Sequence, residues 1–290
     1  MDTQTLDLDA VGTYLKEHLP GFEGPLEVKK FEGGQSNPTF LLTTPKNRYV
    51  LRRKPPGTLL KSAHAVDREY RVIAALGKTD VPVPEIYLLC QDESIVGTPF
   101  YVMAHVEGRI FRNPTVPEAA DAAERSAIFD AMLDTLVRIH LVDWEALGLA
   151  DFGKPGNYMA RQTGRWSKQY LASKTDDIKS MDQLMTWLAE NVPNDETTAI
   201  VHGDFRLENM IVHPTEPRVI AVLDWELSTL GHPLADLAYS CMGYHIPVGG
   251  NQRFGFLGID FEKTGIPTEN AFVASYCRRT GRENIPDWTF

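Results

Sequence analysis

Cysteine is scarce in this sequence, which argues against a disulfide-stabilised fold. Three cysteines, Cys90, Cys241 and Cys277, occur in 290 residues, and none forms a C-x-x-C pair. An odd count without such spacing is typical of a protein in a reducing compartment. Residues 1–4 are acidic and polar, unlike a signal peptide, and no apolar run is long enough to cross a bilayer. We therefore expect a cytoplasmic protein that contacts no membrane.

Basic residues are also too few for a nucleic-acid-binding surface to be expected. The chain has 29 lysines and arginines against 39 aspartates and glutamates, which gives a formal net charge of −10. Nucleic acid phosphates attract clusters of Lys and Arg, so we expect no nucleic acid partner. Hydrophobic residues make up 43% of the chain, as in a globular protein with a core. A chain of this length can form two domains or one bilobed unit.

The hydrophobic pattern predicts a sheet in the first part of the chain and helices in the remainder. Short apolar runs bounded by turn residues predict strands at residues 26–31, 39–44, 48–53, 85–90 and 98–106. Helical spacing predicts helices at residues 8–19, 63–76 (capped by Ser62), 117–140, 157–173, 177–192, 233–243 and 269–280. We predict an α+β fold with a sheet-rich N-terminal lobe, residues 1–105, and a mostly helical C-terminal lobe, residues 106–290.

One stretch places ionisable side chains between two apolar strands. Residues 199–201 and 210–212 are apolar, and the polar side chains of the loop between them are His202, Asp204, Arg206, Glu208 and Asn209. Groups of this kind are costly near a core unless they are paired or take part in chemistry. A further apolar strand, residues 219–223, ends directly at Asp224. The sequence therefore predicts a functional site formed by this loop and Asp224.

The motif His202-Gly203-Asp204-x-x-x-x-Asn209, followed by Asp224, resembles the catalytic loop and metal site of the aminoglycoside phosphotransferase family. That family is a branch of the protein-kinase-like fold. The resemblance implies a bilobed molecule whose first lobe has a five-stranded antiparallel sheet and one helix. The first lobe, residues 1–105, would bind the nucleotide, and the second lobe, residues 106–290, would be catalytic and bind the substrate. It also implies ATP and Mg²⁺ as cofactors and a small-molecule hydroxyl group as the phosphoryl acceptor.

The resemblance assigns a role to the main residues of the motif. Asp204 would accept or orient the proton of the substrate hydroxyl group, as the catalytic base. Asn209 and Asp224 would bind the Mg²⁺ ion on the nucleotide phosphates. Arg206 would neutralise the negative charge that develops on the γ-phosphoryl group. Glu208 has no assigned role.

Two further positions resemble supports of the same loop, and a third imitates a metal ligand. Asp236 matches an aspartate that braces the loop by hydrogen bonds, and His202 is expected to be a buried, oriented side chain. Asp151-Phe152-Gly153 is a literal D-F-G, the triplet that carries a metal ligand in protein kinases. It precedes the loop and lies among glycines and prolines, so we interpret it as a turn.

Upstream, Arg52 and Glu69 resemble the phosphate-binding cation and the helix carboxylate with which it pairs. The cation of the family pattern is a lysine, whereas this sequence has Arg52. Arginine can also hold phosphates and pair with a carboxylate. Lys54 lies on the same face of the predicted strand, because side chains alternate with a period of two, and stays an alternative to Arg52.

A glycine-rich turn lies between the first two predicted strands, where the family has its nucleotide-covering loop. Gly34 would let backbone amides approach the phosphates, and Ser36 and Asn37 would add hydrogen bonds. An ordinary turn has the same composition, so that alternative stays open. The motif G-x-x-x-x-G-K-[ST] is absent from the sequence, which excludes a P-loop fold.

Residues 101–108 resemble the hinge that binds adenine in the same family. Met103 would lie behind the adenine ring. The carbonyl of Ala104 and the amide of Val106 would bind the edge of the ring. Because these are backbone contacts, we interpret His105 as a bystander.

Longer segments narrow the resemblance to the phosphotransferase domain that accompanies, or is fused to, acyl-CoA dehydrogenases. These segments are residues 49–57, 62–70 and 161–170, and the sequence has no flavin motif. This branch implies phosphorylation of a hydroxyacyl-CoA. Arg161, Arg165 and Lys168 would form a cationic helix face beside Trp166 that suits such an anionic substrate. A solvated face with Trp166 packed inward is the alternative.

Two other functions remain open on the sequence alone. An aminoglycoside kinase would line its substrate pocket with acidic residues. A pseudokinase would bind nucleotide without turnover, which Arg52 in place of lysine allows and which intact Asp204, Asn209 and Asp224 argue against. The apolar end of the chain, residues 287–290, looks interrupted, so further helices on the substrate side are expected. The sequence predicts no oligomeric state.

Overall fold

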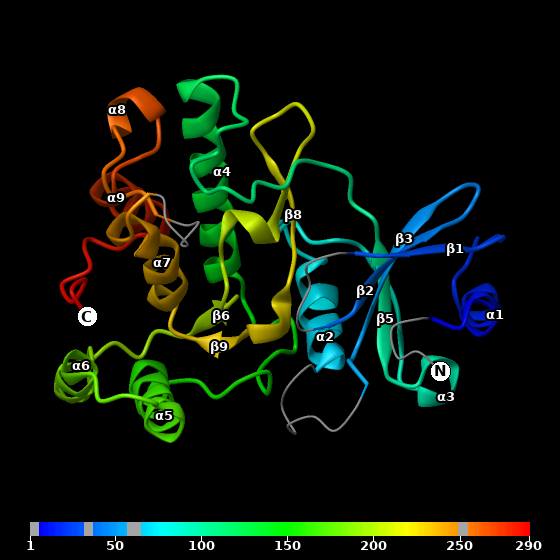
Figure 1. Cartoon of the computed structure of the whole chain (residues 1–290), viewed down its shortest axis with the longest axis horizontal. Helices are drawn as coiled ribbons and strands as arrows, with labels where there is room; N and C mark the ends of the chain where they lie inside the picture. Colours follow the sequence, from blue (N-terminus) through cyan, green and yellow to red (C-terminus); the bar gives the residue numbers. More distant parts are fainter. Residues whose placement is uncertain (1–5, 32–36, 57–64, 249–254) are drawn as a thin grey trace. The chain divides into compact units, whose positions relative to one another are not determined.

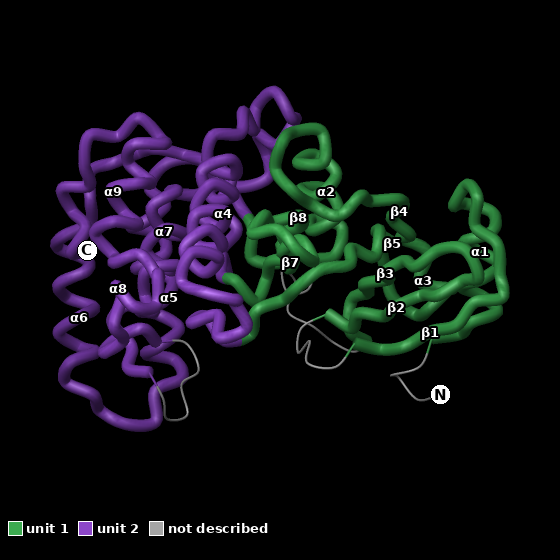
Figure 2. The backbone as a smooth tube through the Cα atoms, turned by 90° about the horizontal axis from the view of Figure 1, so that it is seen from above, with its two compact units in different colours: residues 1–112, 207–228 green, residues 113–206, 229–290 purple. Residues whose placement is uncertain are grey.

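The computed structural model describes residues 6–31, 37–56, 65–248 and 255–290 (Figure 1). The predicted phosphate contacts Gly34 and Ser36 and the predicted helix cap Ser62 lie outside the described residues. Contacts between Cα atoms divide the chain into two units (Figure 2). Unit 1 consists of residues 1–112 and 207–228, and unit 2 of residues 113–206 and 229–290.

This division differs from the predicted single boundary after residue 105. The chain passes between the units three times, after residues 112, 206 and 228, because the segment 207–228 belongs to unit 1. Arg109 and Val212 exchange backbone hydrogen bonds of 2.7 and 2.8 Å, and the amide of Val222 donates to the carbonyl of Pro82 at 2.8 Å. These bonds join segments that are distant in sequence, and hydrophobic patterning does not encode such pairing.

Unit 1 contains the predicted five-stranded antiparallel sheet. Its strands are β1 (Glu27–Lys30), β2 (Thr39–Thr43), β3 (Arg48–Arg53), β4 (Ile86–Cys90) and β5 (Phe100–Ala104), in the spatial order β1-β2-β3-β5-β4. Successive side chains point to opposite faces of a sheet. One face contributes Phe40, Leu51 and Phe100 to a core that also includes residues of α1 (Leu8–His18). Arg52 and Tyr101, which are register partners on β3 and β5, point to the other face.

The helix α2 (Val66–Leu76) packs against β4 and β5 (Figure 1). It begins three residues later than predicted, and Ala65 at its N-terminal cap makes no side-chain hydrogen bond. Glu69 is buried together with Val72 and Ile73, which follow at i+3 and i+4 on the same helix face. The apolar neighbours therefore carry the Glu69 carboxylate into the interior of unit 1. A one-turn helix that the sequence did not predict, α3 (Glu93–Val96), lies between β4 and β5.

The remainder of unit 1 is a hairpin with a short 3-10 helix at each end. Its elements are η1 (Leu207–Asn209), β7 (Met210–Val212), β8 (Val219–Val222) and η2 (Trp225–Leu227). The strands pair antiparallel, with Met210 opposite Val222. Both strands are almost entirely apolar and buried, as predicted, so the polar residues Asn209 and Asp224 are confined to the strand ends.

Unit 2 is mostly helical, as predicted. Its helices are α4 (Ala122–Leu141), α5 (Tyr158–Ser173), α6 (Lys179–Glu190), α7 (Leu234–Cys241), η3 (Met242–His245), α8 (Phe261–Thr264) and α9 (Glu269–Thr280). The strand β6 (Ala199–Val201) pairs antiparallel with β9 (Thr229–Gly231), which the sequence did not predict. The helix α4 begins at Ala122 rather than at residue 117, because the Asp121 carboxylate caps it by accepting from the Glu124 amide at 2.8 Å. Across the described ranges, no helix combines the length and apolarity needed to cross a membrane.

Candidate active site

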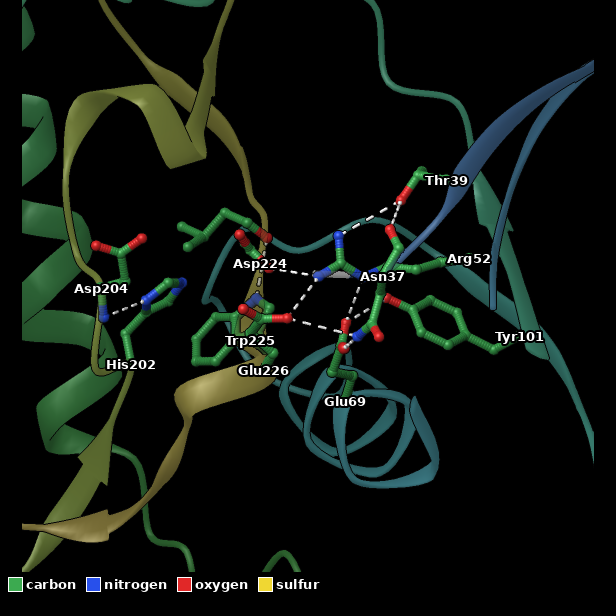
Figure 3. Close-up of polar contacts among 11 residues, drawn as sticks. Asn37, Thr39, Arg52, Glu69, Tyr101, His202, Asp204, Asp224, Trp225 and Glu226 are labelled. Carbon is green, nitrogen blue, oxygen red and sulfur yellow. Dashed lines mark hydrogen bonds and ion pairs between the residues drawn. The ribbon is translucent and has the colours of Figure 1, made fainter. Parts of the chain in front are cut away.

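Unit 1 contains a partly buried polar cluster centred on Arg52 (Figure 3). The members of this Arg52 cluster are Asn37, Thr39, Arg52, Glu69, Tyr101, Asp224 and Glu226. They come from β2, β3, β5, α2, η2 and the adjoining loops. The Arg52 side chain is 13% exposed and that of Glu69 is 1% exposed, so water screens their charges little.

Arg52 contacts three carboxylates at once. Its Nε lies 2.9 Å from Glu69 Oε2, and its Nη2 lies 2.5 Å from Asp224 Oδ1 and 3.3 Å from Glu226 Oε2. The structure thus brings together the predicted Arg52 and Glu69, and adds the predicted metal ligand Asp224. Among the described residues, Lys54 forms no ion pair of this kind.

Neutral side chains hold Glu69 in place. The Tyr101 hydroxyl donates to Oε2 at 2.9 Å, and the Asn37 amide donates to Oε1 at 2.6 Å. Burial raises the pKa of Glu69 to about 7, although Arg52 and the Tyr101 hydroxyl act to lower it. Burial alone would lower the pKa of Arg52, but the carboxylates of Glu69, Asp224 and Glu226 outweigh it and raise that pKa above its ordinary value. Arg52 therefore stays charged.

The metal ligands predicted from the sequence lie on neighbouring backbone segments. The Leu223 amide donates to the Asn209 carbonyl at 2.8 Å, so Asn209 and Asp224 occupy adjacent ends of β7 and β8. Asp224 has a left-handed backbone, with φ of 65° and ψ of 57°, which is uncommon outside glycine. The next residue, Trp225, is buried, and its indole donates to the Val222 carbonyl at 3.0 Å. This anchor holds the strained Asp224 backbone in place.

These residues fit a divalent cation held jointly with a nucleotide. Three carboxylates surround one guanidinium in the Arg52 cluster, which leaves an excess of negative charge. Mg²⁺ commonly binds one or two protein oxygen ligands and takes the rest from phosphates and water. Among the described residues, no group of three or more His, Cys, Asp or Glu that could hold a metal occurs.

In unit 2, the predicted support of the loop is present. Asp236 on α7 is buried, and its carboxylate accepts from the amides of His202 and Gly203 at 2.6 and 2.8 Å. His140 Nε2 lies 3.4 Å from the same carboxylate. Burial acts to raise the pKa of Asp236, but His140 and the His202 amide outweigh it and lower that pKa. Asp236 is therefore a buried anion that fixes the start of the loop.

The same loop orients the predicted base. His202 is fully buried, and its Nδ1 accepts from the Asp204 amide at 3.2 Å (Figure 3). Asp204 Oδ1 accepts from the Tyr239 hydroxyl at 2.6 Å and lies 3.2 Å from Arg206 Nε. The Asp204 side chain is 19% exposed, so it is accessible yet held.

Sequence reasoning missed several members of these networks, among them Tyr101, Glu226 and Tyr239. Glu226 lies two places after Asp224, and this close spacing of two acidic residues is the signal that could have identified it. Tyr239 follows Asp236 by three residues on the same helix, so helical spacing could have placed it beside the loop. Tyr101 could be paired with Arg52 only once the strand register was known.

For the segment predicted to bind adenine, the structure shows burial and backbone contacts. Met103 is buried on β5, and the amide of Ala104 at the end of that strand donates to the Glu85 carbonyl at 2.8 Å. Val106 is half-buried beyond the strand. Burial and Arg48 lower the pKa of His105. The adenine contacts of this segment stay predictions.

The literal D-F-G is a turn, as interpreted from the sequence. Asp151 is exposed in this turn, whereas Phe152 is buried and its amide donates to the Leu149 carbonyl at 2.9 Å. A Cβ on Gly153 would lie 2.6 Å from the Leu230 amide nitrogen, so the turn packs closely on β9. These residues lie in unit 2, whereas Asp224 belongs to unit 1.

The predicted cationic helix face is present in part. Arg165, Trp166 and Lys168 of α5 are exposed, and the Arg165 guanidinium lies 5.6 Å from the centre of the Trp166 ring. Trp166 is 58% exposed, which contradicts the alternative in which it packs inward. Arg161 instead donates to the carbonyls of Lys154 and Gly156.

Comparison with known proteins places these features in a family context. Residues 27–267 match the model of the Phosphotransferase enzyme family. The chain is 46% identical to Acyl-CoA dehydrogenase family member 10 of Mus musculus, over 99% of this chain and 27% of that protein. It is 47% identical to Acyl-CoA dehydrogenase family member 11 of Rattus norvegicus, over 98% of this chain and 37% of that protein. The chain therefore spans well under half the length of these relatives.

Solved structures confirm the predicted α+β, kinase-like fold. A Ralstonia eutropha protein provisionally described as an aminoglycoside phosphotransferase is 49% identical, with a TM-score of 0.89 over 98% of this chain and 83% of that chain. The macrolide 2'-phosphotransferase MphH of Brachybacterium faecium shares the fold at 16% identity, with a TM-score of 0.64 over 97% and 86% of the two chains. The streptomycin–ATP complex of APH(2")-IIa also shares it, at 17% identity and a TM-score of 0.61 over 96% and 83%.

Proposed function

The chain belongs to the phosphotransferase enzyme family, and we propose that it transfers the γ-phosphoryl group of ATP to a hydroxyl group of a small molecule. The observation that carries this proposal is the pairing of Arg52 with Glu69 and Asp224, at 2.9 and 2.5 Å. Kinase-like enzymes use a cation paired with a helix carboxylate to hold phosphates, next to an aspartate that binds the metal. The ATP in the solved complex of APH(2")-IIa supports the same donor for this chain.

Each residue of the two networks has a task in this proposal. Asp204 accepts or orients the proton of the acceptor hydroxyl, and the Tyr239 hydroxyl and Arg206 hold its carboxylate for that task. Asn209 and Asp224 hold Mg²⁺, which neutralises charge on the phosphates when it is bound. Arg52 binds phosphate oxygens, and its ion pair with Glu69 holds the guanidinium in position for this contact.

We further propose a hydroxyacyl-CoA as the acceptor. The Acyl-CoA dehydrogenase family names of the curated relatives support this class of substrate. Arg165 and Lys168 are exposed beside Trp166 on α5, and an exposed cationic and aromatic surface suits a phosphate-bearing CoA ester. The name of the Ralstonia eutropha protein supports an aminoglycoside acceptor as the second candidate.

Purified protein with ATP, Mg²⁺ and panels of hydroxyacyl-CoAs and aminoglycosides tests these proposals. We expect a phosphorylated hydroxyacyl-CoA, detected by mass spectrometry, together with stoichiometric ADP. Asp204→Ala should lower kcat by about 10³-fold, because it removes the base, whereas Asp151→Ala in the D-F-G turn should leave it unchanged. Phosphorylated aminoglycosides alone would favour the second candidate. Nucleotide binding without any phosphorylated product would identify a pseudokinase and contradict the proposal.

A further inference from the structure

One nitrogen of Arg52 serves two carboxylates that flank the buried Trp225 (Figure 3). Nη2 lies 2.5 Å from Asp224 Oδ1 and 3.3 Å from Glu226 Oε2. The Trp225 indole is fixed by its hydrogen bond to the Val222 carbonyl, so the backbone between the two carboxylates is held. Two acceptors of the same chemistry therefore stand beside one donor, at unequal distances.

The other end of the guanidinium is anchored. Its Nε pairs with Glu69 at 2.9 Å, and Glu69 is itself held by Tyr101 and Asn37. Releasing this end would leave the Glu69 carboxylate buried without its cation, which is strongly unfavourable. The Nη2 end has no such restriction, because it can turn from Asp224 to Glu226 while Nε stays on Glu69. The Asn37 amide already bridges the two glutamates, at 2.6 Å from Glu69 Oε1 and 3.5 Å from Glu226 Oε2.

A metal ion bound to Asp224 Oδ1 would require such a movement. In the proposed function, Asp224 binds Mg²⁺, and Mg²⁺ sits about 2.1 Å from its oxygen ligands. In the structure, Arg52 Nη2 is 2.5 Å from Asp224 Oδ1, so a cation on that oxygen would crowd the guanidinium and meet a like charge. Glu226 is the carboxylate already positioned to take the displaced nitrogen.

We propose that Glu226 is a positioning residue that receives Arg52 when Asp224 binds the divalent cation. With the metal bound, Arg52 keeps Glu69 and pairs with Glu226, so the guanidinium stays neutralised and aimed at the phosphates. Without the Glu226 charge, Arg52 stays on Asp224 and competes with the metal. Glu226 thus raises the metal affinity of unit 1 by acting through Arg52. This inference rests on the proposed function.

Metal binding by the whole chain tests the proposal without any acceptor substrate. The probe is Mn²⁺, an oxygen-preferring substitute for Mg²⁺, titrated with saturating ADP while the free ion is followed by electron paramagnetic resonance. Glu226→Gln keeps the side-chain size and should raise the Kd for Mn²⁺ by about tenfold, as expected for the loss of one charged partner. Glu216→Gln is the matched control, since Glu216 is exposed between β7 and β8 and pairs with Arg218 at 3.2 Å. Its Kd should equal that of the parent chain.

A second arm separates action through Arg52 from direct action on the metal. Arg52→Lys keeps a positive charge for Glu69, and so keeps the fold, but cannot reach two carboxylates with one planar group. In the Arg52→Lys background, Glu226→Gln should change the Kd for Mn²⁺ less than twofold. A tenfold effect that persists in that background would make Glu226 a metal ligand or a simple field effect and overturn the proposal. An unchanged Kd in Glu226→Gln alone would overturn it as well.

The binding experiment distinguishes a failure of the proposed function from a failure of this inference. A parent chain that binds neither Mn²⁺ nor ADP would contradict both the proposed function and this inference. A parent chain that binds both, together with a Glu226→Gln variant of equal affinity, would contradict only the role of Glu226. Circular dichroism and thermal unfolding of each variant show that the comparison is made between folded proteins.

Discussion

At the residue scale, one oxygen of Asp204 has two polar partners, a hydroxyl that donates a hydrogen bond to it and a guanidinium that forms an ion pair with it. The Tyr239 hydroxyl lies 2.6 Å from Oδ1, and Arg206 Nε lies 3.2 Å from the same atom. Tyr239 is carried by a helix, whereas Arg206 is 39% exposed and lies on the loop itself. The hydroxyl is therefore the more rigid of the two partners, and we expect it to set the orientation of the carboxylate.

Removing that hydroxyl tests its importance. Tyr239→Phe should lower kcat by about tenfold with little change in the KM for ATP, because a hydrogen bond to a charged group contributes about 1.5 kcal/mol. Steady-state kinetics of phosphoryl transfer give both constants. Tyr244→Phe is the matched control, since it removes a hydroxyl that donates to the Pro267 carbonyl at 2.8 Å, away from the loop. Equal kcat values for the two variants would contradict an orienting role for Tyr239.

At the element scale, a single helix supports the first half of the predicted catalytic loop, residues 202–205. Three residues of α7 contact successive loop residues: Asp236 binds the amides of His202 and Gly203, Tyr239 binds Asp204, and Ser240 donates to the Phe205 carbonyl at 3.1 Å. These residues are spaced i, i+3 and i+4, which places them on one helix face. The loop conformation therefore depends on the position of α7.

A second element-scale feature is the close approach of β7 to Gly108. A Cβ on Gly108 would lie 2.4 Å from the Val212 carbonyl oxygen and 2.5 Å from Ile211 Cγ2. Backbone bonds between Arg109 and Val212 hold the segments at this separation. The glycine is thus required by packing, where the hairpin joins the remainder of unit 1.

Two glycine-to-alanine changes should have opposite effects on stability. Gly108→Ala should destabilise the protein by about 1–3 kcal/mol, as overpacking does. Gly164→Ala, in the middle of α5 with no atom within 4 Å of the added Cβ, should stabilise it by about 0.5–1 kcal/mol through helix propensity. Urea unfolding of the two variants and the parent chain measures both effects. A Gly108→Ala variant as stable as the parent chain would contradict the close packing.

At the scale of the whole molecule, the chain returns to unit 1 in the middle of the predicted motif. Asp204 and Arg206 belong to unit 2, whereas Asn209 and Asp224 belong to unit 1. The boundary after residue 206 falls inside the stretch that the sequence presents as one loop. The predicted base and the predicted metal ligands are therefore supported by different sets of contacts, and a substitution in one set need not disturb the other.

The pH dependence of stability should reflect the buried charges of both units. Burial lowers the pKa of His232 below its ordinary value of 6.5, although Asp195 at 3.1 Å acts to raise it. As the pH falls, the unfolded chain therefore binds a proton on His232 before the folded chain does. The contribution of His232 to the free energy of unfolding is complete above pH 6.5 and is lost as the pH falls through the folded pKa. Glu69 has the opposite sign, because its raised pKa means that stability is lost as the pH rises towards about 7.

A single substitution isolates the histidine contribution. His232→Gln should make the decline in unfolding free energy between pH 7 and 5 shallower, by at most about 1.4 kcal/mol per pH unit. Urea unfolding at several pH values measures the slope, with His18→Gln, an exposed position on α1, as the control. A slope equal to that of the parent chain would show that His232 does not titrate with folding.

The secondary-structure elements and the candidate catalytic and metal-binding residues could be predicted because the local sequence encodes them. Short apolar runs bounded by turn residues predicted β2 and β3, and the polar residues at the ends of the apolar runs 199–201, 210–212 and 219–223 identified Asp204, Asn209 and Asp224. The start of α2 and the strand β9 were missed. The first lacks a side-chain cap, and the second has three residues, too few to show a period.

Only the tertiary structure determines which of these residues form ion pairs with one another. Arg52 and Asp224 are separated by 172 positions, and their contact follows from the register of β3 and from the hairpin that returns to unit 1. The same return makes Glu226 a third carboxylate on one guanidinium, which its position after Trp225 does not reveal. Local patterns record the preferences of adjacent residues, whereas these ion pairs join backbone segments that meet only when the core has formed.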